Sequence, residues 1–238
     1  MFASLGSEFS SGSGSKSAEQ IKVVEGYRHP LYNNDNHLYD IGLLKLETTS
    51  TQKTASLCAT DGSDNRVGTM ATALGWGLTE DRKSSLTLKE VDVRIISNAE
   101  CNKGYRNRIT EGMICAGNGN GKDSCSGDSG GPLLANDVLV GVVSWGGKCG
   151  ARAGVCTRLT YVMDVIDDVL KGATGTDSIL SENLSKTELL SKINRPRRPT
   201  SNDTPASDAV SLNPGLESTS SSTGSAAISG WQSSRKQL

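Results

Sequence analysis

The stretch that decides how this sequence is interpreted spans residues 122–133 and reads Lys122-Asp123-Ser124-Cys125-Ser126-Gly127-Asp128-Ser129-Gly130-Gly131-Pro132-Leu133. Ser129 stands between glycines on an expected tight loop, next to a cysteine and two acids. Glycines let a backbone turn sharply and present N–H groups to a developing negative charge. A nucleophilic serine needs such donors and a neighbouring base. The stretch is therefore a candidate nucleophile loop, although an ordinary Gly/Ser turn shares its local composition.

The sequence around this loop predicts mostly β-structure. Alternating or continuous apolar runs predict strands over residues 20–25, 41–46, 69–77, 86–96 and 138–146. One segment, 161–170, predicts a helix, because its apolar residues recur at helical spacing and Gly172 follows them. Short strands with frequent turns and few helices indicate an all-β sandwich or barrel.

Composition divides the chain near residue 171 and limits its partners. Residues 1–171 hold all six cysteines, whereas residues 172–238 are rich in Ser, Thr, Asn, Asp and Pro and contain one aromatic residue, Trp231. We expect this second part to be a disordered tail, since it has little apolar surface to bury. Lys and Arg number 25 against 26 Asp and Glu, so the chain is not built to coat nucleic acid or an anionic membrane. The Ser/Gly-rich start, residues 1–20, shows no apolar core of a signal peptide.

The chain resembles the chymotrypsin–trypsin family of serine proteases. Gly127–Pro132 is similar to that family's nucleophile signature, and the likeness is collinear over about 17–170. Five further segments resemble family motifs in the same order: Asp40–Leu46, Leu74–Gly77, Met113–Gly117, Val143–Gly146 and Gly154–Arg158. The resemblance implies two six-stranded β-barrels that end in a helix, with the first barrel incomplete here and no cofactor or metal.

The resemblance also implies roles for individual residues. Ser129 matches the nucleophile, the N–H groups of Gly127 and Ser129 match the oxyanion hole, and Asp40 matches the acid that orients the catalytic histidine. Asp123 matches the acid at the base of a pocket for Arg or Lys, and its carboxylate would pair with such a side chain. The substrate-aligning strand and the pocket walls match Ser144, Trp145, Gly146 and Gly154.

The cysteines fit the same resemblance. It implies disulfides between Cys101 and Cys115 and between Cys125 and Cys149. Cys58 and Cys156 are left over, and their state stays open, since Cys58 resembles a residue that some family members link to a propeptide or light chain. Disulfides indicate an oxidising, extracellular setting.

Two departures put activity in doubt. The family's Ala-Ala-His-Cys segment has no counterpart, and the two histidines, His29 and His37, are expected to be exposed loop residues. The free Ile/Val-Val-Gly-Gly end, whose ammonium pairs with the acid before the nucleophile, is also not found. That acid is Asp128, which we expect to stay in solvent, because an unpaired buried carboxylate is costly.

Two explanations remain open at this stage. The chain is a truncated copy of an active secreted protease, or it is a non-catalytic homologue that binds a polypeptide partner, as glucanase-inhibitor-type proteins do. Either way we expect no hydrolysis by this chain, and a monomer unless open barrel edges associate.

Overall fold

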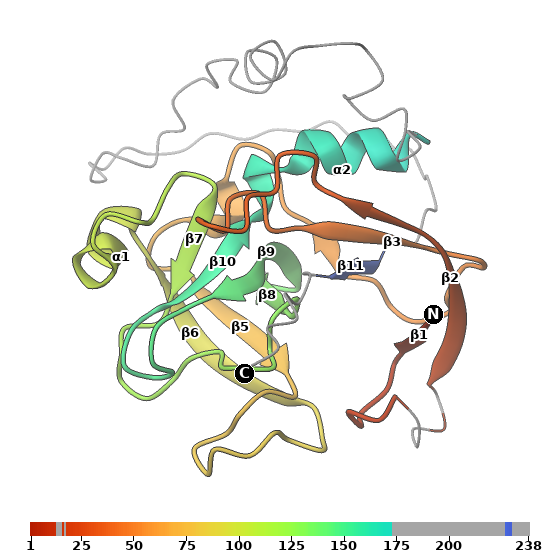
Figure 1. The fold of residues 1–238 in the computed structure, drawn as a ribbon, viewed down its shortest axis with the longest axis horizontal. Helices are drawn as coiled ribbons and strands as arrows, with labels where there is room; N and C mark the ends of the chain where they lie inside the picture. Colours follow the sequence, from red (N-terminus) through yellow and green to blue (C-terminus); the bar gives the residue numbers. More distant parts are fainter. Residues whose placement is uncertain (13–15, 17, 173–226, 230–238) are drawn as a thin grey trace, which may run out of the picture.

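The computed structural model describes residues 1–12, 16, 18–172 and 227–229 of the chain. Most of them build two β-sheets, of seven and four strands, which lie side by side in Figure 1. Six strands of the larger sheet follow the order β10-β7-β6-β5-β8-β9, and pairing of β10 with β9 closes them into a barrel. The larger sheet consists of β4 (Ser56–Leu57), β5 (Met70–Gly75), β6 (Lys89–Ile96), β7 (Met113–Ala116), β8 (Pro132–Ala135), β9 (Val138–Trp145) and β10 (Gly154–Arg158).

The smaller sheet has the order β1-β2-β3-β11 and does not close within the described residues. Its strands are β1 (Phe2–Leu5), β2 (Glu19–Arg28), β3 (Gly42–Leu46) and β11 (Ala227–Ser229). All of its pairings are antiparallel, with Tyr27 of β2 opposite Leu43 of β3 and Leu43 in turn opposite Ile228 of β11. Asp40 lies two residues before β3, so this sheet carries it toward the barrel.

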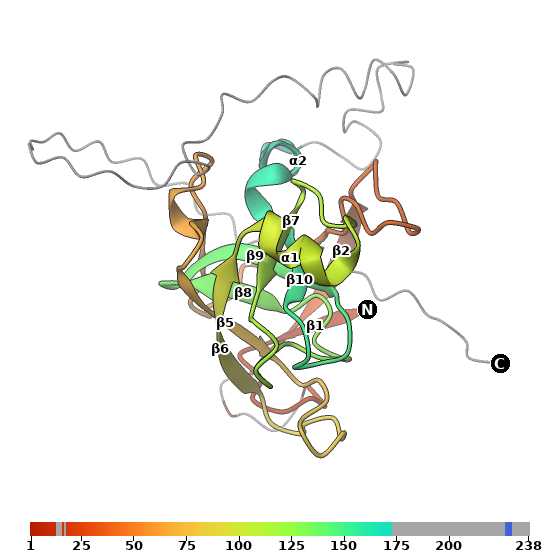
Figure 2. The ribbon, with the colours of Figure 1, turned by 90° about the vertical axis from the view of Figure 1, so that its left-hand side faces the viewer.

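Two α-helices pack against the barrel: α1 (Asn98–Tyr105) and α2 (Met163–Leu170). The chain also forms two short 3-10 helices, η1 (Ser63–Asn65) and η2 (Leu159–Tyr161). The hydroxyl of Ser97 caps α1 by accepting a hydrogen bond from the N–H of Glu100, at 3.1 Å. Helix α2 lies over one end of the barrel, above β7 and β9 in Figure 2, where Ile166 is 1% exposed. No helix of the described residues has the length and apolarity that crossing a membrane requires.

The core fills the barrel with branched apolar side chains. Ile114 and Val140 are fully buried, and Leu133 and Val142 are 1% exposed. Strands β7 and β10 are buried at consecutive positions, because a second apolar cluster, which includes Cys101 and Tyr105 of α1 and the fully buried Val155, takes the side chains that alternate with those of the barrel core.

The expected fold class is confirmed: the chain is mostly β, with a closed barrel, an incomplete second sheet and a C-terminal helix. All five expected strands are present, although 86–96 begins later, at Lys89, and the expected helix begins at Met163. Helix α1 was not expected from the sequence, because its residues, Gly104 among them, are mostly polar and form no clear apolar face. The expected disordered segment 172–238 lies outside the described residues, apart from Gly172 and strand β11.

Candidate functional site

The serine loop joins β7 to β8 and leaves Ser129 exposed. Gly127 has a φ of +102°, and a Cβ atom there would lie 3.0 Å from the Cα of Gly77, so only glycine fits. The N–H of Gly130 donates to the carbonyl of Val143 at 2.8 Å, which ties the loop to β9. Within the described residues, neither the N–H of Gly127 nor that of Ser129 donates a hydrogen bond. Both N–H groups of this loop therefore lack an acceptor among the described residues.

Asp40 meets the barrel from the smaller sheet. It is 7% exposed, its Oδ2 accepts a hydrogen bond from Ser144 Oγ at 2.7 Å, and its backbone carbonyl accepts one from Thr157 Oγ1 at 2.7 Å. The buried Oδ1 has no hydrogen-bond partner among the described residues. Burial raises the pKa of Asp40, while the Ser144 bond and the charge of His37 act in the opposite direction. Asp40 is thus a fixed acid with one oxygen open for a donor.

Neither histidine is the exposed loop residue that the sequence led us to expect. His29 is 3% exposed and stacks on Tyr39 with ring centroids 4.4 Å apart. Its Nδ1 accepts a hydrogen bond from the N–H of Leu31 at 3.1 Å, and burial lowers its pKa to about 4. His37 is half-buried, with its ring 5.7 Å from that of Trp145. The expectation failed because aromatic rings on neighbouring segments cover both imidazoles.

Asp128 also differs from expectation, since it turns inward instead of staying in solvent. Its Oδ1 accepts a hydrogen bond from the N–H of Gly77 at 2.7 Å, and its Oδ2 accepts one from the N–H of Cys125 at 2.8 Å. Hydrogen bonds from backbone N–H groups stabilise the ionised carboxylate. They offset the free-energy cost that burial of an unpaired carboxylate would have. Gly75 and Gly77 make room for this carboxylate, because a Cβ on either would collide with it.

Asp123 lies six residues before Ser129 on the same loop, half-buried. Its Oδ2 accepts a hydrogen bond from the N–H of Gly150 at 3.1 Å, and its buried Oδ1 has no partner among the described residues. Burial is the main cause that raises the pKa of Asp123 to about 6, although backbone hydrogen bonds oppose it. A half-satisfied carboxylate of this kind is suited to a cationic ligand.

Two glycines stand beside Asp123 and keep the space near it open. A Cβ on Gly154 would lie 2.5 Å from Asp123 Oδ1, so a side chain there would displace the carboxylate. A Cβ on Gly146 would meet nothing closer than 3.9 Å. Asp123 and Asp128 both line one cavity of about 890 Å³, which runs between the loop after β5 and the loop after β9.

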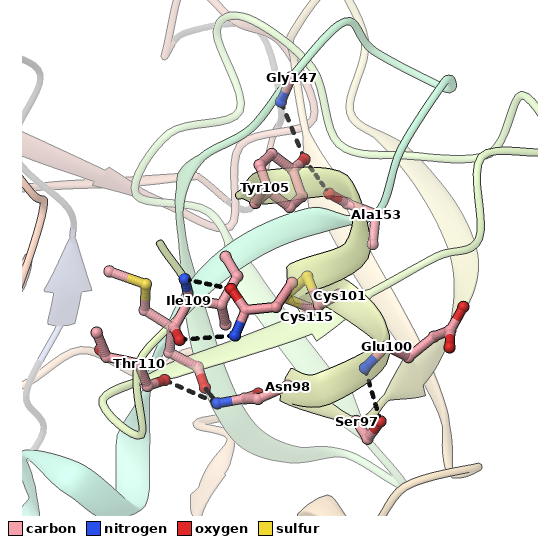
Figure 3. Close-up of a disulfide and its surroundings, with 12 residues drawn as sticks. Ser97, Asn98, Glu100, Cys101, Tyr105, Ile109, Thr110, Cys115, Gly147 and Ala153 are labelled. Atoms are coloured by element: carbon pink, nitrogen blue, oxygen red, sulfur yellow. Dashed lines mark hydrogen bonds between the residues drawn. A yellow bond between two sulfur atoms is a disulfide. The ribbon is translucent and has the colours of Figure 1, made fainter. Parts of the chain in front are cut away.

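Tyr105 braces the same region from α1. Its hydroxyl accepts a hydrogen bond from the N–H of Gly147 at 3.0 Å and donates one to the carbonyl of Ala153, so it links the two segments beside the pocket (Figure 3). Sequence reasoning missed this residue, as it missed Thr157 beneath Asp40. For Tyr105 the available signal was Ser97, a residue type that often begins a helix. For Thr157 it was the presence of a polar residue within the apolar strand β10.

Both disulfides that the resemblance implies are present. Cys101 and Cys115 join α1 to β7 with Cα atoms 6.3 Å apart, and Cys125 and Cys149 join the two loops beside Asp123 with Cα atoms 5.3 Å apart. Cys58 and Cys156 are free and buried. Burial raises the pKa of Cys58 to about 11 and that of Cys156 to about 12, which leaves both as unreactive thiols.

Asp40 is bonded to Ser144, and Asp123 lies against Gly154 on the loop that also carries the exposed Ser129. The family model described as Trypsin matches residues 4–166. The chain belongs to the trypsin family. Among its relatives are glucanase inhibitor protein 3 of Phytophthora infestans, 36% identical over 67% of this chain, and kallikrein-8 of Mus musculus, 34% identical over 63% of it.

The trypsin family also supplies a structural neighbour. A solved structure described as neuropsin, a serine protease expressed in the limbic system of mouse brain, aligns with a TM-score of 0.64 and 32% identity over 71% of this chain and 78% of that one. The chain spans only 65% and 63% of the lengths of the glucanase inhibitor and the kallikrein.

Proposed function

We propose that this chain is a serine-endopeptidase homologue whose pocket at Asp123 binds an arginine or lysine side chain of a polypeptide partner, and that these 238 residues do not hydrolyse peptide bonds. The observation that carries the proposal is the Asp123 carboxylate, which is half-buried and has one oxygen without a partner among the described residues. An ammonium or guanidinium group would complete its hydrogen bonds and restore its charge. In this proposal Gly146 and Gly154 form the pocket walls, and Ser144 and Trp145 align the bound chain.

The proposed lack of turnover rests on the missing base. Attack by Ser129 requires a group that accepts its proton, and His29 is unsuited to this because its Nδ1 is already occupied and its ring is buried. No described hydrogen bond links His37 to Asp40 or to Ser129. In this proposal Ser129 is the nucleophile position, Gly127 and Ser129 are the oxyanion-hole positions and Asp40 is the orienting acid, but no base transfers a proton from Ser129.

A second candidate function is inhibition of another secreted protein, such as a glucanase. The observation in its favour is that glucanase inhibitor proteins of Phytophthora recur among the relatives, at 34–37% identity. In this role the protease-like surface would bind a partner protein as a whole. The two disulfides support an extracellular location for either role.

Turnover and serine labelling test the proposal together. The purified chain is incubated with arginine- and lysine-amide substrates and with a fluorophosphonate probe, alongside Ser129→Ala. We expect no measurable hydrolysis, no labelling at Ser129, and the same partner binding for both proteins. Turnover that disappears in Ser129→Ala would overturn the proposal, and His37→Ala and His29→Ala would then identify the base.

Peptide binding and glucanase inhibition distinguish the two candidate functions. A chain that only binds basic side chains retains an arginine peptide, and loses it in Asp123→Ser. A chain that acts as an inhibitor also slows a purified glucanase at micromolar concentration. A glucanase that stays fully active argues against the second candidate.

A further inference from the structure

Next to Gly147, which lines the cavity that contains Asp123, lies a cluster of positive charge that the proposed binding of a basic side chain does not use. Arg108 places its guanidinium carbon 4.7 Å from the centre of the Trp145 ring, and Arg152 places its own 5.7 Å from the centre of the Tyr105 ring. The two rings are themselves in edge-to-face contact, with centroids 5.1 Å apart. The two arginines therefore lie on one continuous aromatic surface, which we call the arginine shelf (Arg108, Arg152, Tyr105 and Trp145).

The arginine shelf adjoins the pocket directly. Trp145 precedes Gly146, and a Cβ on Gly146 would lie 3.9 Å from the Tyr105 hydroxyl. Gly147 donates its N–H to that hydroxyl, and a Cβ on Gly147 would lie 3.1 Å from Cδ of Arg152. The stem of Arg152 therefore packs against Gly147, in the segment that follows β9. A polypeptide whose basic side chain reaches Asp123 would lie near this shelf, because Gly147 also lines the cavity that contains Asp123.

The charges on the shelf are not neutralised by the protein. Both arginines are exposed, and neither forms an ion pair with any residue that the structure describes. His37 adds an imidazole on the Trp145 ring, at 5.7 Å. This local excess stands out because the chain as a whole has a net charge of −1. Stacking on aromatic rings holds a guanidinium in place while leaving its edge N–H groups free to bind a carboxylate.

We propose that the partner of this chain is a polypeptide in which an acidic residue lies close to the arginine or lysine that enters the pocket, and that Arg108 and Arg152 select for that acid. This inference rests on the proposed function, since the basic side chain at Asp123 positions the acidic one. The two charges of the partner then match two sites of opposite sign: Asp123 in the pocket and the arginine shelf beside it. Charge complementarity of this kind contributes to the specificity and rate of association more than to affinity alone.

Matched peptides test the inference. Short alanine-based peptides carry one central arginine and one glutamate, placed in turn at each of the three positions before or after it, and each has a glutamine twin. An extended chain covers about 10 Å in three residues, which matches the range over which charges act at moderate salt. Affinities are measured by titration calorimetry at low and at high salt.

We expect at least one glutamate peptide to bind about 3- to 10-fold more tightly than its glutamine twin at low salt, with the difference shrinking at high salt. Arg108→Gln/Arg152→Gln should remove the difference and leave the glutamine peptides bound as before. The control Arg66→Gln removes an exposed arginine from the loop between η1 and β5 and should retain the difference.

The outcomes separate the two claims. Equal binding of glutamate and glutamine peptides at every position, with both lost in Asp123→Ser, would overturn the selection of an acidic residue by the arginine shelf. The proposed function would still stand. A preference that survives in Arg108→Gln/Arg152→Gln would also overturn it. If no peptide binds the wild-type chain, the proposed function fails, and this inference fails with it.

Discussion

In the proposed function, protonation of Asp123 sets the pH range over which the pocket binds a cation. Its pKa is raised to about 6, chiefly by burial, so below that pH the free protein holds a neutral carboxylic acid that attracts a guanidinium weakly. Because the folded pKa lies above the usual value, the same group favours the folded state at low pH, and that contribution is lost as the pH rises through about 6.

We predict that the affinity for benzamidine is nearly constant above about pH 7 and falls about tenfold per pH unit below about pH 6, with protonation of Asp123. Titration calorimetry from pH 4.5 to 8 measures it, and Asp123→Asn serves as the control without a titrating group. A flat profile for the wild-type chain would show that Asp123 does not bind the cation.

Gly77 admits the carboxylate of Asp128 and is expected to tolerate no side chain. A Cβ at this position would lie 2.6 Å from both Asp128 oxygens, so Gly77→Ala must displace the carboxylate from its two backbone donors. We predict a loss of about 2 kcal/mol in the free energy of unfolding, measured by urea denaturation. Gly26→Ala is the matched control, because its Cβ would meet Leu44 at an ordinary 3.6 Å. Equal losses in the two variants would contradict the tight fit at Gly77.

The two disulfides differ in the elements that they join, and their removal should separate stability from binding. Cys101–Cys115 spans 14 residues and joins α1 to β7, whereas Cys125–Cys149 spans 24 residues and joins the two loops beside Asp123. Replacing either pair with alanine should lower the free energy of unfolding by about 3 kcal/mol.

Only loss of Cys125–Cys149 should also weaken benzamidine binding, because the loop that carries Asp123 is then free to move relative to Gly150. Denaturation and calorimetry on both double variants check this. Benzamidine binding that is weakened equally by both would argue that the disulfides act only through global stability.

The sequence predicted the strands well because their alternating or continuous apolar runs record which residues are buried. It also placed Ser129, Asp123 and Asp40 on loops, where glycines and motif order mark them. It missed α1, whose buried residues Cys101 and Tyr105 are too few to reveal a helical period. It misjudged His29, His37 and Asp128, since their burial depends on Tyr39, Trp145 and Gly77, which come from other segments and are brought close only by folding.

The arginine shelf could not have been predicted for the same reason. Arg108 and Trp145 are far apart in the sequence, and nothing in either local stretch indicates that the two stack. Tyr105 and Arg152 meet because α1 and the loop after β9 pack on adjoining parts of the barrel.

At the scale of the whole molecule, the smaller sheet ends at strand β1, which exposes an apolar side chain. Phe2 is 64% exposed on this outer strand. An apolar edge strand favours pairing with a second copy. We predict weak, concentration-dependent association in sedimentation velocity experiments, which Phe2→Lys should reduce without changing the urea midpoint. Association that is unchanged in Phe2→Lys would place the contact elsewhere.

The proposed function requires the pocket to recognise a positive charge through Asp123. One titration tests this directly. Benzamidine and its neutral analogue benzamide are each titrated into the wild-type chain and into Asp123→Asn at pH 7.5. We predict that the wild-type chain binds benzamidine at least about 30-fold more tightly than Asp123→Asn does, as expected for the loss of one partner from a buried charge pair, while benzamide binds both proteins weakly and alike. Equal affinity of the two proteins for benzamidine would contradict the account.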